Sequence, residues 1–225
     1  MDDAARAHGL LPLHRSEALS DGIFAVAMTL LVIELKLPEH ALVQSGGDLA
    51  QALAALLPKA MSWALSFFVL ALFWIGHHRA HAFLRRTDSR LVGLNLLELA
   101  VVTLMPFSTA LSGEYGRAML AQVVFSTNMA LLGVSAFFVV RYIHRHPELA
   151  ATPMPLAIYR SARLRIGGLI GISIIAVAIA PLFSSAAMGN MAFMLMALLT
   201  PISRRLERRA LRESAAAQAT SDAAQ

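Results

Sequence analysis

Apolar stretches separated by short polar segments recur along the chain. A helix needs about 20 residues to cross the hydrocarbon core of a bilayer, and each apolar stretch has about that length. The pattern predicts six membrane-spanning helices, at residues 17–37, 56–80, 91–112, 118–142, 164–183 and 185–203. Only the segment PLFSSAAMGN separates the fifth from the sixth, which predicts a helical hairpin with a tight turn. We therefore expect an all-α fold of the polytopic membrane class.

Polar segments bound this helical region at both ends. Residues 1–14 are too polar for the apolar part of a signal peptide, so we expect the first apolar stretch to remain as the first span. Residues 206–225 are charged and then rich in alanine and serine, which is typical of a disordered tail. The predicted organisation is a cytoplasmic N-terminal segment (1–14), a six-helix transmembrane domain (15–205) and a cytoplasmic tail (206–225).

The composition supports a membrane protein. Of the 225 residues, 57% are hydrophobic and 15% are charged, whereas soluble domains carry about 25% charged residues. The net charge is +5, but the basic residues cluster at the ends of apolar stretches and form no basic surface with interleaved aromatic residues. Nucleic acid is therefore not an expected partner. The chain has no cysteine, which excludes disulfides and thiolate metal sites.

The placement of arginine predicts the orientation in the membrane. The basic segments are residues 77–90, 141–165 and 204–212. The loops with almost no lysine or arginine are residues 38–55, 113–117 and 184–190. Because basic loops stay on the cytoplasmic side, this alternation predicts that both termini are cytoplasmic and that the protein lies in the cell (inner) membrane.

Several polar residues are predicted to meet in one layer near the cytoplasmic ends of the first three spans. They are Arg15, Ser20, Asp21, His77, His78 and Asn95. Polar and ionisable side chains inside a membrane usually face protein or water and bind one another. The layer is interpreted first as a packing network that holds the first three spans together. A gating or proton-sensing role is the alternative, because histidine titrates near neutral pH.

The histidines do not predict a metal site. His77 and His81 have the i, i+4 spacing that places two ligands on one helical face. No glutamate follows His77 and no third ligand is evident, so we expect no metal. Glu98 lies three residues after Asn95 and on the same helical face, where it either extends the polar layer or forms part of a proton path. The spacing of these groups fits no hydrolase motif, so the chain is not expected to be an enzyme.

One side of the first span combines small, branched and hydroxyl side chains. Helical spacing aligns Gly22, Val26, Thr29, Ile33 and Leu37, with Leu30 beside them. Such a stripe usually packs against another helix, and a threonine inside a membrane usually bonds to its own backbone. Periodicity alone therefore leaves open whether this side faces a pore.

The motif R-x4-SDGIFAVAMTLLVIEL resembles the first-helix signature of the transmembrane protein 175 potassium-channel family. The segment FWIGHHRAHAFLRRTDSRLVGLNLLELAVVTLMPFSTAL is similar to the second and third helices of that family, so the resemblance covers roughly residues 12–112. Prokaryotic members are single six-helix chains. The chain departs from the family pattern at Leu19, where a phenylalanine is usual, and at Glu98, where an apolar residue is usual.

The resemblance implies that the first helices of four identical subunits line a central pore in a homotetramer. Val26 would form the apolar constriction, Leu30 and Ile33 further narrow rings, and Thr29 a ring of hydroxyls. K+ would be the permeant ion, and no cofactor is implied. No TVGYG-like carbonyl filter occurs in the chain. Selectivity would then come from the hydroxyls and from partial dehydration of the ion at an apolar neck.

A proton-coupled secondary transporter is the alternative function. It would use Asp21, Glu98 and the pair His77 and His78 as relay groups. Transporters of this kind often contain inverted repeats with helices broken at matching positions. The chain shows no convincing internal repeat, although Pro106 and Pro181 have positions that can break the third and fifth helices.

Overall fold

The structure, a computed structural model, describes residues 10–37 and 46–180, together with Phe193, Ser203, Arg205, Glu207 and Arg209. Its long helices are α2 (Leu13–Ile33), α4 (Leu57–His81), α5 (Ser89–Thr103), α6 (Met105–Glu114), α7 (Met119–Arg145) and α8 (Leu156–Ile179). Within this part of the chain, 5 helical stretches are long and apolar enough to cross a membrane, with α5 and α6 counted as one. The all-α membrane fold is thereby confirmed. The predicted sixth span, residues 185–203, lies outside the described residues except at Phe193 and Ser203.

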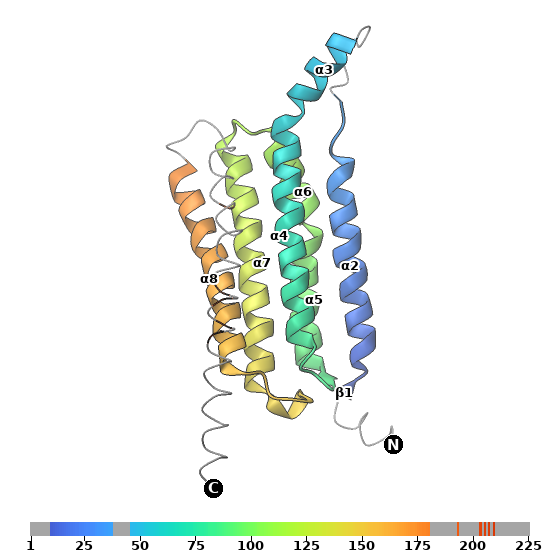
Figure 1. Cartoon of the computed structure of the whole chain (residues 1–225), viewed down its shortest axis with the longest axis vertical. Helices are drawn as coiled ribbons and strands as arrows, with labels where there is room; N and C mark the ends of the chain where they lie inside the picture. Colours follow the sequence, from blue (N-terminus) through green and yellow to red (C-terminus); the bar gives the residue numbers. More distant parts are fainter. Residues whose placement is uncertain are drawn as a thin grey trace.

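The candidate spans run alternately in opposite directions and lie side by side, with α6 continuing α5 in the same direction (Figure 1). Helix α2 lies at one flank of the bundle and packs against α4, α5 and α6. Helix α8 lies at the opposite flank, where α7 is its main neighbour. Among the described helices, the pore helix predicted from the sequence therefore has neighbours on only one side.

The predicted boundaries of the first and fifth spans are shifted in the structure. Helix α2 begins at Leu13 and ends at Ile33, instead of spanning 17–37. Pro38 disfavours a helical conformation at Leu37, so the helix is not expected to reach the predicted end. Leu37 therefore lies beyond the helix and does not continue the stripe. Helix α8 begins at Leu156, directly after Pro155, instead of at residue 164. Its first turns contain basic residues, so hydropathy does not mark them although they are helical.

The third predicted span, 91–112, is divided into two helices. Helix α5 ends at Thr103 and α6 begins at Met105, with Leu104 between them. Pro106 occupies the first turn of α6, where its missing N–H group costs nothing because the first N–H groups of a helix have no partner within the helix. The break that Pro106 predicts in the third span is thus present.

Two local elements were not predicted from hydropathy. Residues 38–55 were expected to be a connector, but α3 (Gly46–Ala55) is a helix. Its alanine, leucine and glutamine residues favour a helix, although ten residues are too few to appear in a search for membrane spans. Strand β1 (Leu10–Leu11) pairs antiparallel with β2 (Thr87–Asp88), which fastens the start of the chain to the loop before α5.

The loop before α5 also contacts the loop between α7 and α8. Leu84 and Ala150 form an isolated antiparallel bridge, and the Arg85 amide donates to the Leu149 carbonyl at 2.9 Å. Asp88 caps α5 by accepting from the Leu91 amide, and its other oxygen accepts from the Tyr142 hydroxyl of α7 at 2.7 Å. These contacts fix the relative height of α5 and α7 at this end of the bundle.

Small residues allow α7 and α8 to approach closely. A Cβ atom at Gly133 would lie 2.8 Å from Cγ1 of Ile170, so no larger side chain fits there without movement. Ala136 of α7 and Ser173 and Ala176 of α8 are also buried. Because lipid is as apolar as a helix surface, close contact of this kind is a main source of association between helices in membranes.

Candidate pore face and polar layer

One side of α2 packs into the bundle. Ser20, Phe24, Ala27 and Leu31 are buried, at a spacing of three to four residues. Phe24 and Leu31 are fully inaccessible, and both belong to the apolar core. This spacing matches one face of a helix, so the rotation of α2 about its axis is fixed by the bundle.

The opposite side of α2 is exposed and has few neighbours within the part of the chain that the structure describes. Val26 is 56% exposed, Leu30 42% and Ile33 52%, and Thr29 is exposed as well. A groove of about 310 Å³ borders Val26 and Leu30 and lies between α2 and Thr103 of α5. The four residues predicted to face a pore thus share the uncovered side of α2.

The hydroxyl of Thr29 bonds to its own helix. Its Oγ1 donates to the carbonyl oxygen of Val26 at 2.8 Å. This is the local bond expected for a threonine inside a membrane helix. Because the hydroxyl proton points to the backbone, the lone pairs of Oγ1 remain available to accept hydrogen bonds or to coordinate a cation.

A buried polar cluster joins α2 to α5. Asn95 is 1% exposed, and its Nδ2 donates to Ser16 Oγ at 3.1 Å and to Ser20 Oγ at 3.0 Å. Ser20 Oγ lies 3.3 Å from Asn95 Oδ1 and 2.9 Å from the carbonyl oxygen of Ser16. The predicted approach of Ser20 and Asn95 is therefore present, and the two side chains tie the uncovered helix to the body of the subunit.

Asp21 faces a different direction from Ser20. Its Oδ1 accepts from Nε1 of Trp74 at 2.8 Å, and the Trp74 ring stacks on His78 at 6.0 Å between centroids. Asp21 and His78 are exposed, as is Arg15, which makes no ion pair with any residue that the structure describes. These groups lie on the outside of the subunit.

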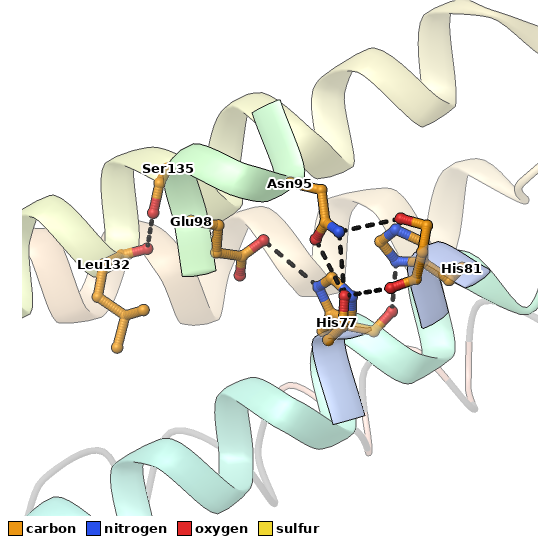
Figure 2. Close-up of polar contacts among 8 residues, drawn as sticks. His77, His81, Asn95, Glu98, Leu132 and Ser135 are labelled. Atoms are coloured by element: carbon orange, nitrogen blue, oxygen red, sulfur yellow. Dashed lines mark hydrogen bonds and ion pairs between the residues drawn. The ribbon is translucent and has the colours of Figure 1, made fainter. Parts of the chain in front are cut away.

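A second buried cluster joins α4 to α5. His77 Nδ1 lies 3.4 Å from Glu98 Oε2, and the two side chains are only 4% and 2% exposed. Figure 2 shows Glu98 pointing toward His77, with Asn95 close by on the same helix. His81 stacks on His77 at 3.9 Å between ring centroids, and its Nδ1 lies 3.0 Å from the His77 carbonyl oxygen. Within the described ranges, no three potential ligands gather in a group that could hold a metal.

The predicted polar layer therefore consists of three separate groups at a similar level of the bundle. Ser20 and Asn95 form one, His77 and Glu98 the second, and Asp21 belongs to the third. Two contact residues were missed by the sequence analysis. Ser16 lies one turn before Ser20 and Trp74 one turn before His78, so helical spacing held a signal for both.

Apolar helices in alternating directions with polar clusters in the interior define a multi-pass membrane protein. A family model described as "Endosomal/lysosomal potassium channel TMEM175" matches residues 15–106. A crystal structure of a lysosomal potassium-selective channel TMEM175 homolog from Chamaesiphon minutus matches with a TM-score of 0.69 and 31% identity, covering 85% of this chain and 97% of that one. The chain belongs to the TMEM175 family.

Relatives of the chain carry the names of ion channels. A potassium channel of Chamaesiphon minutus is 44% identical over 101 residues, which are 45% of this chain and 49% of the relative. The endosomal/lysosomal proton channel TMEM175 of Homo sapiens is 30% identical over 115 residues, which are 49% of this chain and 23% of the relative. The match thus spans about half the length of the bacterial relative and less of the human one. Neither relative is named an enzyme, in agreement with the expectation from the sequence.

Proposed function

We propose that the chain is a subunit of a potassium-selective channel in which the uncovered side of α2 lines a central pore. The observation that supports this most strongly is the two-sided character of α2. Its buried side is held in the bundle by Phe24, Leu31 and the Ser20–Asn95 contact, whereas its other side exposes Val26 and Ile33. A helix held in this way can present a fixed ring of side chains to copies of itself.

The pore requires several copies of the chain. One helix cannot enclose a path for water, and identical subunits usually close into a ring around an axis. A homotetramer, with four α2 helices around the axis, is the assembly that we propose. Val26 then forms the narrowest apolar ring, Leu30 and Ile33 add further apolar rings, and a ring of this kind can close by losing its water.

Thr29 supplies the oxygen atoms that favour K+. Its hydroxyl donates to the Val26 carbonyl, so its oxygen faces outward as an acceptor. In the proposed tetramer, four such oxygens replace part of the hydration shell of a K+ ion at the neck. Selectivity then depends on the balance between these ligands and the free energy of removing water from the ion. No cofactor takes part.

We propose that the basic end of the bundle is cytoplasmic. Arg85, Arg145 and Arg160 lie at the end where α4 and α7 finish and α5 and α8 begin. The positive-inside rule favours the cytoplasmic side of the cell membrane for this end. With the six spans predicted from the sequence, both termini share that side. The His77–Glu98 pair then lies in the cytoplasmic half of the bundle.

Flux of K+ through the purified full chain in liposomes tests the function. With a potassium gradient and no proton gradient, a channel should give a sustained K+ flux that exceeds the Na+ flux under matched conditions. Flux that needs a proton gradient or a co-substrate would instead support the transporter, with Asp21, Glu98 and the histidines as relay groups. Protein that is folded but carries neither ion would contradict both.

A further inference from the structure

The contact between His77 and Glu98 is longer than a tight charge-assisted hydrogen bond. Charge-assisted N–H···O bonds are usually about 2.7–2.9 Å long, whereas Nδ1 and Oε2 are 3.4 Å apart. His77 Nε2 is also buried and has no hydrogen-bond partner among the described residues. A buried pair that served only to hold two helices would need good geometry and satisfied atoms to offset the free energy of desolvation.

A cavity borders this pair on the side away from α2. It has a volume of about 70 Å³ and is lined by His77, Glu98, Val139 of α7 and Ile166 of α8. A water molecule needs about 10–15 Å³ of such space and two or more polar partners. The cavity is therefore large enough for several waters, and the two ionisable side chains supply polar partners for them.

Among the residues that the structure describes, the charged side chains that line the cavity contact another carboxylate and not this pair. Arg79 of α4 and Arg165 of α8 line the same cavity, and both contact the buried carboxylate of Glu207, Arg165 at 3.9 Å. On α4, His81 stacks on His77. The side chains of α7 that line the cavity, Ala136, Val139 and Val140, are apolar. A net charge is unfavourable in this setting, so the neutral arrangement is one proton shared by the imidazole and the carboxylate.

Helix α5 links this proton to the proposed pore. Glu98 contacts α4, and Asn95, three residues earlier on α5, contacts Ser16 and Ser20 of α2. Residues three apart lie on the same helical face, one turn from each other. A change in the contact between α4 and α5 therefore acts on the same segment that holds α2.

We propose that His77 and Glu98 form a proton-binding site within the subunit, reached from the cavity beside α7 and α8, whose occupancy regulates conduction from outside the pore. Removal of the proton leaves a carboxylate and a neutral imidazole, so the pair passes from net neutral to a charge of −1. The regulatory part rests on the proposed channel function and on α2 lining the pore. The proton site itself does not depend on either.

Infrared difference spectroscopy of the full chain in lipid, between acidic and alkaline buffers, tests the site without measuring conduction. We expect a pH-dependent band of the Glu98 side chain, in the carboxyl or the carboxylate stretching region, that is lost in Glu98→Gln and retained in Glu148→Gln, because binding of the shared proton changes this group whether the proton lies nearer to Oε2 or to Nδ1. Glu148 is the matched control, because it is an exposed carboxylate at the same end of the bundle. The His77→Gln variant should shift the band, since it changes the hydrogen-bond partner. A difference spectrum that is the same in Glu98→Gln and in the wild-type protein would overturn the proton site.

The K+ flux is then measured over the same pH range, and its pH dependence is compared with that of the infrared band. In liposomes that contain the wild-type protein, the K+ flux should change with pH, with the same midpoint as the infrared band. This pH-dependent part of the flux should be lost in Glu98→Gln but not in Glu148→Gln. If Glu98→Gln fails to fold, the shift of the band in His77→Gln decides the assignment. A band that titrates while the flux does not change would overturn the regulatory role alone. Absence of any K+ flux, with the band present, would refute the channel function and leave the proton site standing.

Discussion

Replacing Asn95 by leucine removes the polar contact between α5 and α2 at nearly constant volume. The change eliminates the donors to Ser16 and Ser20 at 3.1 and 3.0 Å. Hydrogen bonds between membrane helices contribute about 0.6 kcal/mol on average and about 1.7 kcal/mol at most. Two such contacts predict a loss of about 1–3 kcal/mol in the free energy of unfolding. Ser20 keeps its bond to the Ser16 carbonyl, so the loss should remain in this range.

The assay is unfolding of the purified protein in mixed detergent micelles with increasing SDS, followed by circular dichroism. Ser173→Ala is the matched control, because Ser173 is equally buried but bonds only to the Leu169 carbonyl of its own helix. It should change the stability by less than Asn95→Leu. The double variant Ser20→Ala/Asn95→Leu should be more stable than the sum of the single changes indicates, by about 0.6–1.7 kcal/mol. Full additivity, or a variant as stable as the wild-type protein, would refute the role assigned to this contact.

Three further changes test the pore and the packing of the bundle. Thr29→Ala should lower the ratio of K+ to Na+ flux while the pore still conducts, because a ring of oxygens is lost; an unchanged ratio would exclude Thr29 as a ligand. Val26→Asn should raise basal flux and weaken selectivity, because the neck becomes wettable; tetramers that conduct as before would exclude Val26 from the neck. Gly133→Ala should destabilise the protein by about 1–3 kcal/mol, because the new methyl group would meet Ile170 at 2.8 Å. The new methyl group in Gly167→Ala meets none of the described residues within 4 Å and should be neutral or stabilising, and equal effects of the two changes would contradict this packing.

Hydropathy predicts where helices cross the membrane, but it predicts less about where they begin and end. The span expected at 56–80 is found at Leu57–His81. Its apolar stretch ends at polar residues in the last turn of the helix, so hydropathy marks this end well. Helices α2 and α8 begin earlier than expected, because their first turns contain polar or basic residues. Backbone hydrogen bonds continue into the interface, so a helix extends beyond the residues that its hydropathy marks.

Sequence also predicts the depth of a residue better than the direction of its side chain. Ser20 and Asp21 have nearly the same depth, yet Ser20 contacts Asn95 inside the bundle and Asp21 contacts Trp74 on the outside. Adjacent residues on a helix point about 100° apart, so one cluster expected from depth became separate groups. The pairing of His77 with Glu98 required the relative rotation of α4 and α5, which only the packed bundle supplies.

Single-cysteine accessibility along α2 tests the central claim most directly. The chain has no cysteine, so each introduced thiol is the only one that a membrane-impermeant, water-soluble reagent can modify. Modification of the Val26→Cys and Ile33→Cys variants should block K+ flux in liposomes, whereas Ala27→Cys and Leu31→Cys, on the buried side of α2, should be unaffected. Block at the buried positions, or no block at Val26 and Ile33 in proteins that conduct, would contradict a pore lined by the uncovered side of α2.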